Sequence, residues 1–142
     1  MQADNAVPKQ RADSAAQSAD AVISLAYLGI SDRPVLPVVI GSSKQRVAAF
    51  LAAHPKDKAL ASGLHVIAAG EAIARALDAL PPAAQAGEPL LSIHIWSGPG
   101  EEEARLPRAP ALTFLRSAAA SLDAAGAQPS GALNGLISAV QQ

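Results

Sequence analysis

The sequence predicts an α/β fold: a small sheet of three strands, or four, mainly parallel, with helices on both faces and extra helices at the N- and C-terminal ends. Three short apolar runs, at 35–40, 64–69 and 90–96, are each followed by a segment with helical spacing of its apolar residues. Strands alternating with helices are typical of a parallel sheet. The length of 142 residues suits one domain. We therefore expect a polar, disordered arm at 1–13 and a single α/β domain at 14–142.

The composition points to a small aliphatic core. Half of the residues are apolar, but alanine is the commonest of them, and the aromatic residues number only one Trp, one Tyr and two Phe. Alanine has the highest helix propensity, and its small side chain allows helices to lie close to a sheet. We expect a core of Leu, Val and Ile, with Ala where elements approach closely.

The first patterned segment, 14–29, is predicted to be a helix that ends at Gly29. Its apolar stripe consists of Ala19, Val22, Ile23 and Ala26. A glycine at this position is typical of a left-handed helix cap. The β-branched pair Val22 and Ile23 leaves a strand as the alternative for part of this segment.

The run 35–40 predicts the first strand, although it contains Pro37. A proline cannot donate to a β-ladder, so this strand either lies at an edge or begins at Val38. The next segment, 44–54, has the clearest helical spacing in the chain, and its apolar stripe consists of Val47, Phe50, Leu51 and His54. Residues 56–58 are expected to form a solvated connection.

The run 64–69 is apolar on both faces apart from His65, which favours a central strand. A helix at 71–80 follows it, and Pro81 and Pro82 end that helix. The run 90–96 alternates, with Leu91, Ile93 and Ile95 on one face and Ser92, His94 and Trp96 on the other.

Residues 97–110 are predicted to form a loop, which is long enough to hold a fourth strand near Arg105 and Leu106. Pro110 suits the first turn of a helix that extends to 125. A last helix is expected from Ser130, which is a favourable cap residue, to about Val140.

The charge pattern excludes several classes of partner. Eleven basic and twelve acidic residues nearly balance, and the basic residues are scattered. Nucleic acids and anionic membranes require clustered cations, so we expect neither as a partner. Long apolar runs and cysteines are absent, which argues against membrane insertion, disulfides and Cys-ligated zinc. We expect a cytoplasmic protein, with a periplasmic or exported mature form whose signal was removed as the alternative.

Candidate ligand-binding residues follow the predicted strands, because the carboxyl ends of parallel strands meet at one edge of the sheet. Ser42, Ser43 and Lys44 lie where a strand meets a helix N-terminus, which suits a phosphate or another small anion. The same serines also suit a simple helix cap. The other candidates at this edge are Gly70, Trp96 and Ser97.

His94 and Glu71 are the candidate acid–base residues. His94 lies on the more polar face of its strand, and the alternative for it is a structural role. We expect a solvated loop at 101–103, where three glutamates follow one another. None of the three histidines has the sequence spacing of a metal motif, so we expect no metal site and no cofactor.

No motif in the sequence identifies a family or a reaction. We therefore expect a non-catalytic accessory or protein-interaction module that binds a protein partner or a second copy of itself. The alternative is a small domain that binds an anionic or phosphate ligand, or an enzyme, with its site at the C-terminal edge of the sheet.

Overall fold

The computed structural model describes residues 20–29, 35–82, 85–98, 100–124, 126 and 130–142. These form a five-stranded mixed sheet with helices on both faces, so the predicted α/β class is confirmed. The strands lie in the order β3-β2-β1-β4-β5. Their bounds are β1 Val22–Tyr27, β2 Val38–Gly41, β3 Leu64–Ile67, β4 Leu91–Trp96 and β5 Glu101–Leu106. The predicted arm at 1–13 lies outside the described residues.

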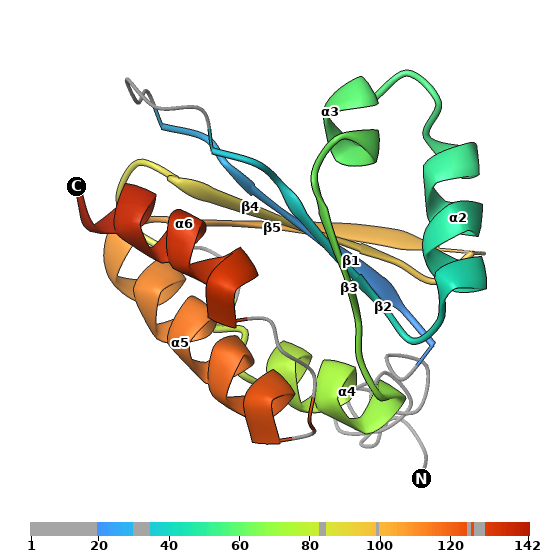
Figure 1. Ribbon diagram of the computed structural model, residues 1–142. Coiled ribbons are helices and arrows are strands. Elements are labelled where there is room, and N and C mark those ends of the chain that lie inside the picture. The colour runs from blue at the N-terminus through green and yellow to red at the C-terminus, as the bar shows by residue number, and fades with distance from the viewer. Residues whose placement is uncertain (1–19, 30–34, 83–84, 99, 125, 127–129) are drawn as a thin grey trace, which may run out of the picture.

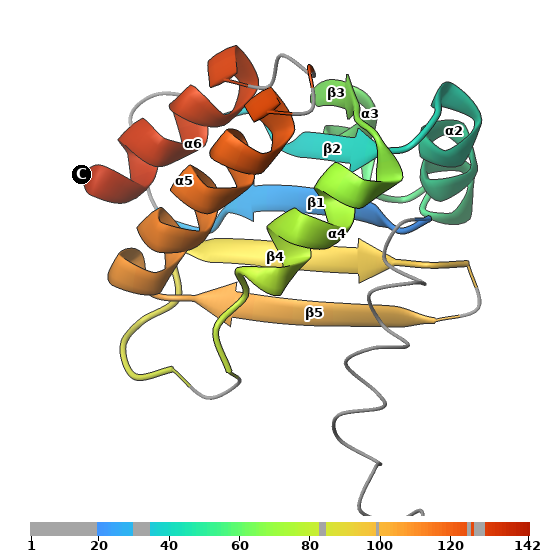
Figure 2. The same cartoon turned by 90° about the horizontal axis from the view of Figure 1, so that it is seen from below.

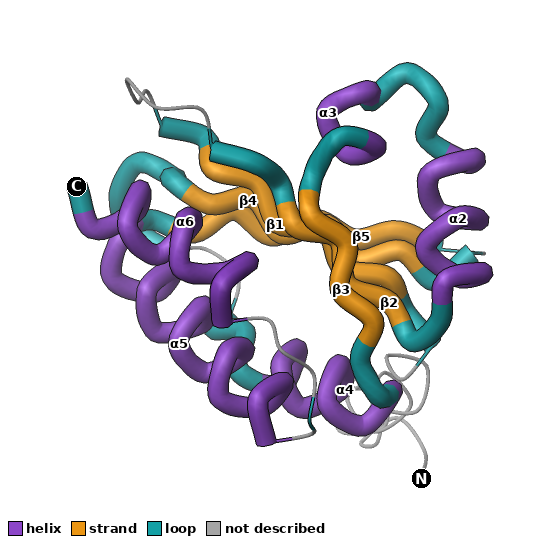
Figure 3. Tube along the Cα trace, in the orientation of Figure 1, coloured by secondary structure: helices purple, strands orange, loops and turns teal. Residues whose placement is uncertain are grey.

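The helices cover the two faces of the sheet unequally (Figures 1, 2 and 3). One face carries α4 (Gly70–Asp78), α5 (Arg108–Ala124) and α6 (Ser130–Gln141), and the other carries α2 (Lys44–Ala53) and the short α3 (Lys58–Ala61). The Arg108 side chain, at the start of α5, donates to the carbonyl of Val140 near the end of α6 over 2.9 Å. The helices predicted at 44–54, 71–80 and 130–140 are confirmed as α2, α4 and α6, with small differences at their ends. The helix predicted at 110–125 is confirmed as α5 up to Ala124, and residue 125 lies outside the described residues.

The sheet is not mainly parallel, which corrects the prediction. Only β2 and β3 pair in parallel; β1 is antiparallel to both β2 and β4, and β5 is antiparallel to β4. Because β2 and β4 both oppose β1, the three strands predicted from the sequence still run in one direction. Their downstream bends therefore lie at the same edge of the sheet, although β1 separates β2 from β4.

The helix predicted over 14–29 is wrong where the structure describes it, because 22–27 is the central strand β1. Val22, Ile23 and Leu25 are each at most 1% exposed. A strand covered on both faces has a continuous apolar run instead of strict alternation, and such a run is easily confused with a buried helix. The β-branched pair Val22 and Ile23 was the correct signal, since such residues favour strands.

Three further elements differ from the prediction. The run at 64–67 forms the edge strand β3 and not a central one, with Leu64 and Ile67 38% and 41% exposed. The loop predicted at 97–110 contains the whole of β5, longer than the fourth strand expected near Arg105 and Leu106. α3 begins within the expected solvated connection. β2 begins at Val38, directly after Pro37, so the proline stays outside the ladder of an interior strand.

Two apolar clusters lie on opposite faces of the sheet. The larger cluster joins Ile23, Leu25, Val38, Ile40, Leu91 and Ile93 to residues of α4, α5 and α6. The smaller cluster consists of Val22, Val39, Val47, Phe50, Leu60 and Trp96. The smaller cluster does not extend over β5, where charged side chains lie on the same face. None of the described helices is both long and apolar enough to cross a bilayer.

We predict that Ile93→Ala destabilises the protein by about 2–5 kcal/mol, because Ile93 is fully buried in the larger cluster and its truncation leaves a cavity. Denaturant unfolding monitored by circular dichroism measures this loss. Leu36→Ala is the control: Leu36 is 47% exposed, so its truncation changes the free energy of unfolding by less than about 0.5 kcal/mol. Equal losses in the two variants would contradict the assignment of the core.

Candidate functional site

Polar side chains gather on the face of the sheet that carries α2. Cross-strand pairing sets Ser24 of β1 beside His94 of β4, and His94 beside Glu103 of β5. The next row of the same face carries Trp96 opposite Glu101. Residues two apart along a strand share a face, so Glu101 lies diagonally across from His94. The register alone therefore brings His94 near two carboxylates.

His54, at the C-terminal end of α2, completes the cluster. Ser43 caps the start of this helix, because its side chain accepts a hydrogen bond from the backbone N–H of Arg46 over 3.1 Å. One helical turn before His54, Phe50 is buried against the sheet, and its ring lies 4.6 Å from that of His54. The rings of His54 and His94 lie 5.4 Å apart, edge to face. Packing of α2 therefore fixes where the His54 imidazole points.

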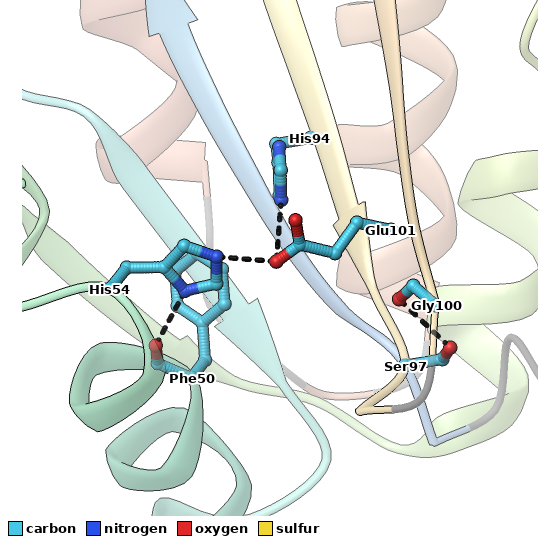
Figure 4. A network of polar contacts seen from close by, with 6 residues as sticks. All are labelled: Phe50, His54, His94, Ser97, Gly100 and Glu101. Atoms are coloured by element: carbon cyan, nitrogen blue, oxygen red, sulfur yellow. Dashed lines mark hydrogen bonds and ion pairs between the residues drawn. The ribbon is translucent and has the colours of Figure 1, made fainter.

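A backbone contact determines the tautomer of His54. Its Nδ1 lies 2.8 Å from the carbonyl oxygen of Phe50 (Figure 4). A carbonyl only accepts, so Nδ1 carries a proton. Nε2 then points at the Glu101 carboxylate, with its nitrogen 2.6 Å from Oε1. Two lone pairs would repel at this distance, so the contact requires a proton or a cation between them.

The electrostatics agree with an imidazolium–carboxylate pair. The hydrogen bond to the Phe50 carbonyl raises the pKa of His54; Glu101 raises it further, and partial burial opposes both effects. The hydrogen bond from His54 lowers the pKa of Glu101. Both side chains are partly exposed, at 22% and 47%, so solvent screens the attraction between them.

His94 approaches the same carboxylate without forming a hydrogen bond. Its Nε2 lies 3.7 Å from Glu101 Oε1, which is too long for such a bond. This nitrogen is buried and has no hydrogen-bond partner in the described part of the chain. A buried nitrogen without a hydrogen-bond partner lowers the stability of the folded state by about 1–3 kcal/mol, so a group that binds this nitrogen would recover part of that free energy. Figure 4 shows one oxygen of the Glu101 carboxylate facing both imidazoles.

Together the three side chains offer two nitrogen donors and one oxygen donor. The donor atoms of His54, His94 and Glu101 all lie within 4.8 Å of one another. In a tetrahedral zinc site with bonds of about 2.0–2.1 Å, neighbouring ligand atoms are about 3.3 Å apart. The observed separations of 2.6 and 3.7 Å lie on either side of that value. Small side-chain movements would bring all three donors onto one ion.

A second polar contact lies beside the cluster on β4 and β5. The Ser92 hydroxyl donates to Glu103 Oε2 over 2.7 Å, and Arg105 Nε lies 3.3 Å from the same oxygen. The hydrogen bond from Ser92 is the main reason that the pKa of Glu103 is lowered. Glu103 is therefore held as a fixed negative charge next to His94.

The predicted anion-binding residues lie at the expected edge of the sheet. Ser43 has its side chain engaged as the cap of α2, and Lys44 is exposed. Ser42, which precedes them, is half-buried. Ser97 lies in the β4–β5 turn, on the other side of β1 from Ser42, Ser43 and Lys44. Its hydroxyl donates to the Gly100 carbonyl over 3.1 Å. An anion site at this edge stays a prediction.

The remaining candidates lie near the same edge but on different faces of the sheet. Gly70 and Glu71 begin α4 on the opposite face of the sheet, where the Glu71 side chain is 88% exposed and pairs with Arg75 over 3.8 Å. Trp96 is buried in the smaller cluster, with the Arg46 guanidinium 5.2 Å from its ring centre. Of the candidates chosen from the sequence, only His94 belongs to the histidine–glutamate cluster.

Sequence reasoning missed the other two members. His54 was interpreted as a helix-end residue and Glu101 as part of a solvated loop. The expectation of no metal site rests on the spacing of histidines along the chain. Such spacing cannot reveal donors that lie far apart in sequence and that tertiary structure brings together from the end of α2, from β4 and from β5. A hairpin assignment for 91–106 would have placed Glu101 diagonally across from His94.

Comparisons with protein families, with curated proteins and with solved structures found no match to this chain.

We predict that the His54–Glu101 pair stabilises the metal-free protein mainly between about pH 4.5 and 6.5. The raised pKa of His54 adds stability that is fully present below its ordinary value of 6.5 and is lost as the pH rises through the folded value. The lowered pKa of Glu101 adds stability that is present above 4.5 and is lost as the pH falls through its folded value. The stability difference between wild type and Glu101→Gln should therefore be greatest inside this window.

Denaturant unfolding in the presence of EDTA, at about pH 5.5 and again at about pH 8.5, measures this difference. Glu102→Gln is the matched control, because Glu102 neighbours Glu101 on the opposite face of β5. A penalty for Glu101→Gln that is the same at both pH values would show that the pair does not contribute in this way.

Proposed function

We propose that this protein binds a divalent transition-metal ion of the zinc type through His54, His94 and Glu101. The observation that carries this proposal is the convergence of three donor atoms within 4.8 Å from three separate elements. Imidazole nitrogens favour zinc, cobalt and nickel over magnesium or calcium, which prefer oxygen ligands. Two histidines and one carboxylate leave at least one coordination position for water or another ligand.

The surroundings of the donors support the same proposal. The Phe50 carbonyl accepts from Nδ1 of His54 and so directs the Nε2 lone pair of the neutral ring at the centre of the cluster. Such a backbone contact is the usual outer partner of a metal-bound histidine. The buried, unpartnered Nε2 of His94 gains a partner when a cation binds. The Glu101 carboxylate supplies the negative charge that compensates the ion.

We predict that wild type binds one Zn²⁺ or Co²⁺ per chain and that His94→Gln weakens binding at least about 100-fold, because loss of a ligand exceeds the loss caused by an outer partner. Isothermal titration calorimetry on protein without a histidine tag measures the affinity. The Co²⁺ complex should also show the visible absorption of a low-coordinate site.

His65→Gln is the matched control for this experiment. It removes a histidine of the edge strand β3, whose Nε2 contacts the Leu60 carbonyl and which lies outside the cluster. Its affinity for zinc should equal that of wild type. Equal affinities for wild type and His94→Gln, or no binding by wild type, would contradict the proposal.

As a second function, we propose self-association through the outer edge of β3, in keeping with the interaction module expected from the sequence. The backbone N–H groups of Leu64 and Ala68 donate to the carbonyls of Pro37, just before β2, and of Gly41, at its end. Main-chain groups alternate in direction along a strand, so the N–H and C=O groups of His65 and Ile67 point outward, away from β2. The edge carries no Lys, Arg, Asp, Glu or Pro between 64 and 67, and such residues normally prevent edge pairing. Two copies paired antiparallel about Val66 would satisfy these groups in both chains.

We predict a concentration-dependent dimer whose dissociation constant rises at least about tenfold in Ile67→Lys, because a charge at an edge strand opposes pairing. Sedimentation equilibrium measures the change. Leu28→Lys is the control, since Leu28 is similarly exposed at 40% but follows the central strand β1. A wild type that remains monomeric at high concentration would rule out this association.

A further inference from the structure

A small cleft opens beside the proposed metal centre. It has a volume of about 160 Å³. Its lining includes both imidazoles, His54 and His94, but not Glu101. The cleft therefore borders both histidines of the cluster, next to Ser24 and Ser92. An ion held by His54 and His94 would lie beside this space, so a further ligand on it would meet the residues of the cleft.

The floor of the cleft consists of two neighbouring cross-strand rows of the sheet, and Ala26 and Ser92 form the second of them. Ser24, His94 and Glu103 are neighbours on β1, β4 and β5 in the first row. Ser24 is buried, at 6% exposure, although it is polar. Ser92 lines the cleft and donates to Glu103, which fixes the position of that carboxylate. A ligand bound to the ion would therefore meet hydroxyl groups and a held carboxylate.

The charge of the lining is negative. Glu103 and Asp57 are its two acidic residues, and Arg105, which contacts Glu103, is not part of the lining. Phe50 and Leu60 supply the apolar wall. With Glu101 on the ion, the metal site and the cleft together contain three acidic side chains, Glu101, Glu103 and Asp57. Like charges at short range in a partly desolvated cleft repel, so an anionic ligand is disfavoured there.

We propose that the open coordination position takes a small uncharged nitrogen- or oxygen-donor ligand and that Glu103 excludes anions from it. This inference rests on the metal site proposed above. The hydroxyl groups of Ser24 and Ser92 accept hydrogen bonds from a neutral donor group, such as the N–H of an imidazole or the O–H of an alcohol. The apolar wall contacts the rest of the ligand.

The test uses the full chain loaded with Co²⁺, whose visible spectrum reports each new ligand. Imidazole is the neutral probe and azide is the anionic probe, both at about pH 8, where imidazole is uncharged. Imidazole should shift the wild-type spectrum at concentrations at least about tenfold lower than azide. Ultrafiltration checks that cobalt stays on the protein during each titration.

Glu103→Gln should strengthen azide binding at least about tenfold while leaving imidazole binding within about twofold, because only the charge is removed. Glu102→Gln is the matched control, on the opposite face of β5, and should keep the wild-type preference. Failure of Co²⁺ to bind would overturn the metal site and this inference together. If Co²⁺ binds and imidazole leaves its spectrum unchanged or strips the cobalt, or azide binds as well as imidazole, this inference alone is overturned.

Discussion

The position of β1 at the centre of the sheet is the constraint on which the rest of the structure depends. Val22, Ile23 and Leu25 are buried, and β2 and β4 pair with β1 on its two sides. Because both neighbours oppose β1, they run in the same direction, and their carboxyl ends lie at one edge. The central strand also requires cover on both faces, which explains why helices lie on each side of a sheet with only one parallel pair.

The unequal cover of the two faces explains where the polar cluster lies. Of the described helices, α4, α5 and α6 cover one face, whereas α2 and the short α3 cover only part of the other. The side chains of β4 and β5 on that second face change from the buried Trp96 to the exposed Glu101 and Glu103. His54 reaches this boundary from the end of α2. Imidazoles held there against Phe50 are partly desolvated, so their contacts with carboxylates are stronger than in open solvent.

Much of the fold was predictable, but the cluster was not. The helices after each predicted strand followed from apolar spacing, and the common direction of three strands followed from the strand–helix alternation. β1 was assigned as a helix because a strand buried on both faces loses its alternation. The sequence does not predict the whole of β5, because its run of glutamates has low strand propensity; pairing with β4 and burial of Leu106 in the larger cluster stabilise it. His54 and Glu101 are 47 residues apart in sequence, so only the packing of α2 on the hairpin brings them into contact.

The two edge strands of the sheet differ in charge, and this difference places the proposed self-association and the proposed metal site at opposite edges. The edge strand β5 carries Glu101, Glu102, Glu103 and Arg105, all exposed, and charges of this kind oppose pairing with another strand. The edge strand β3 carries exposed Leu64 and Ile67 instead. Three strands, β2, β1 and β4, lie between the edge strand β3 and the edge strand β5. A second copy paired at β3 would therefore leave the cluster of His54, His94 and Glu101 open in both chains. The cluster lies beside β5, and the charges of β5 oppose pairing of another strand at that edge.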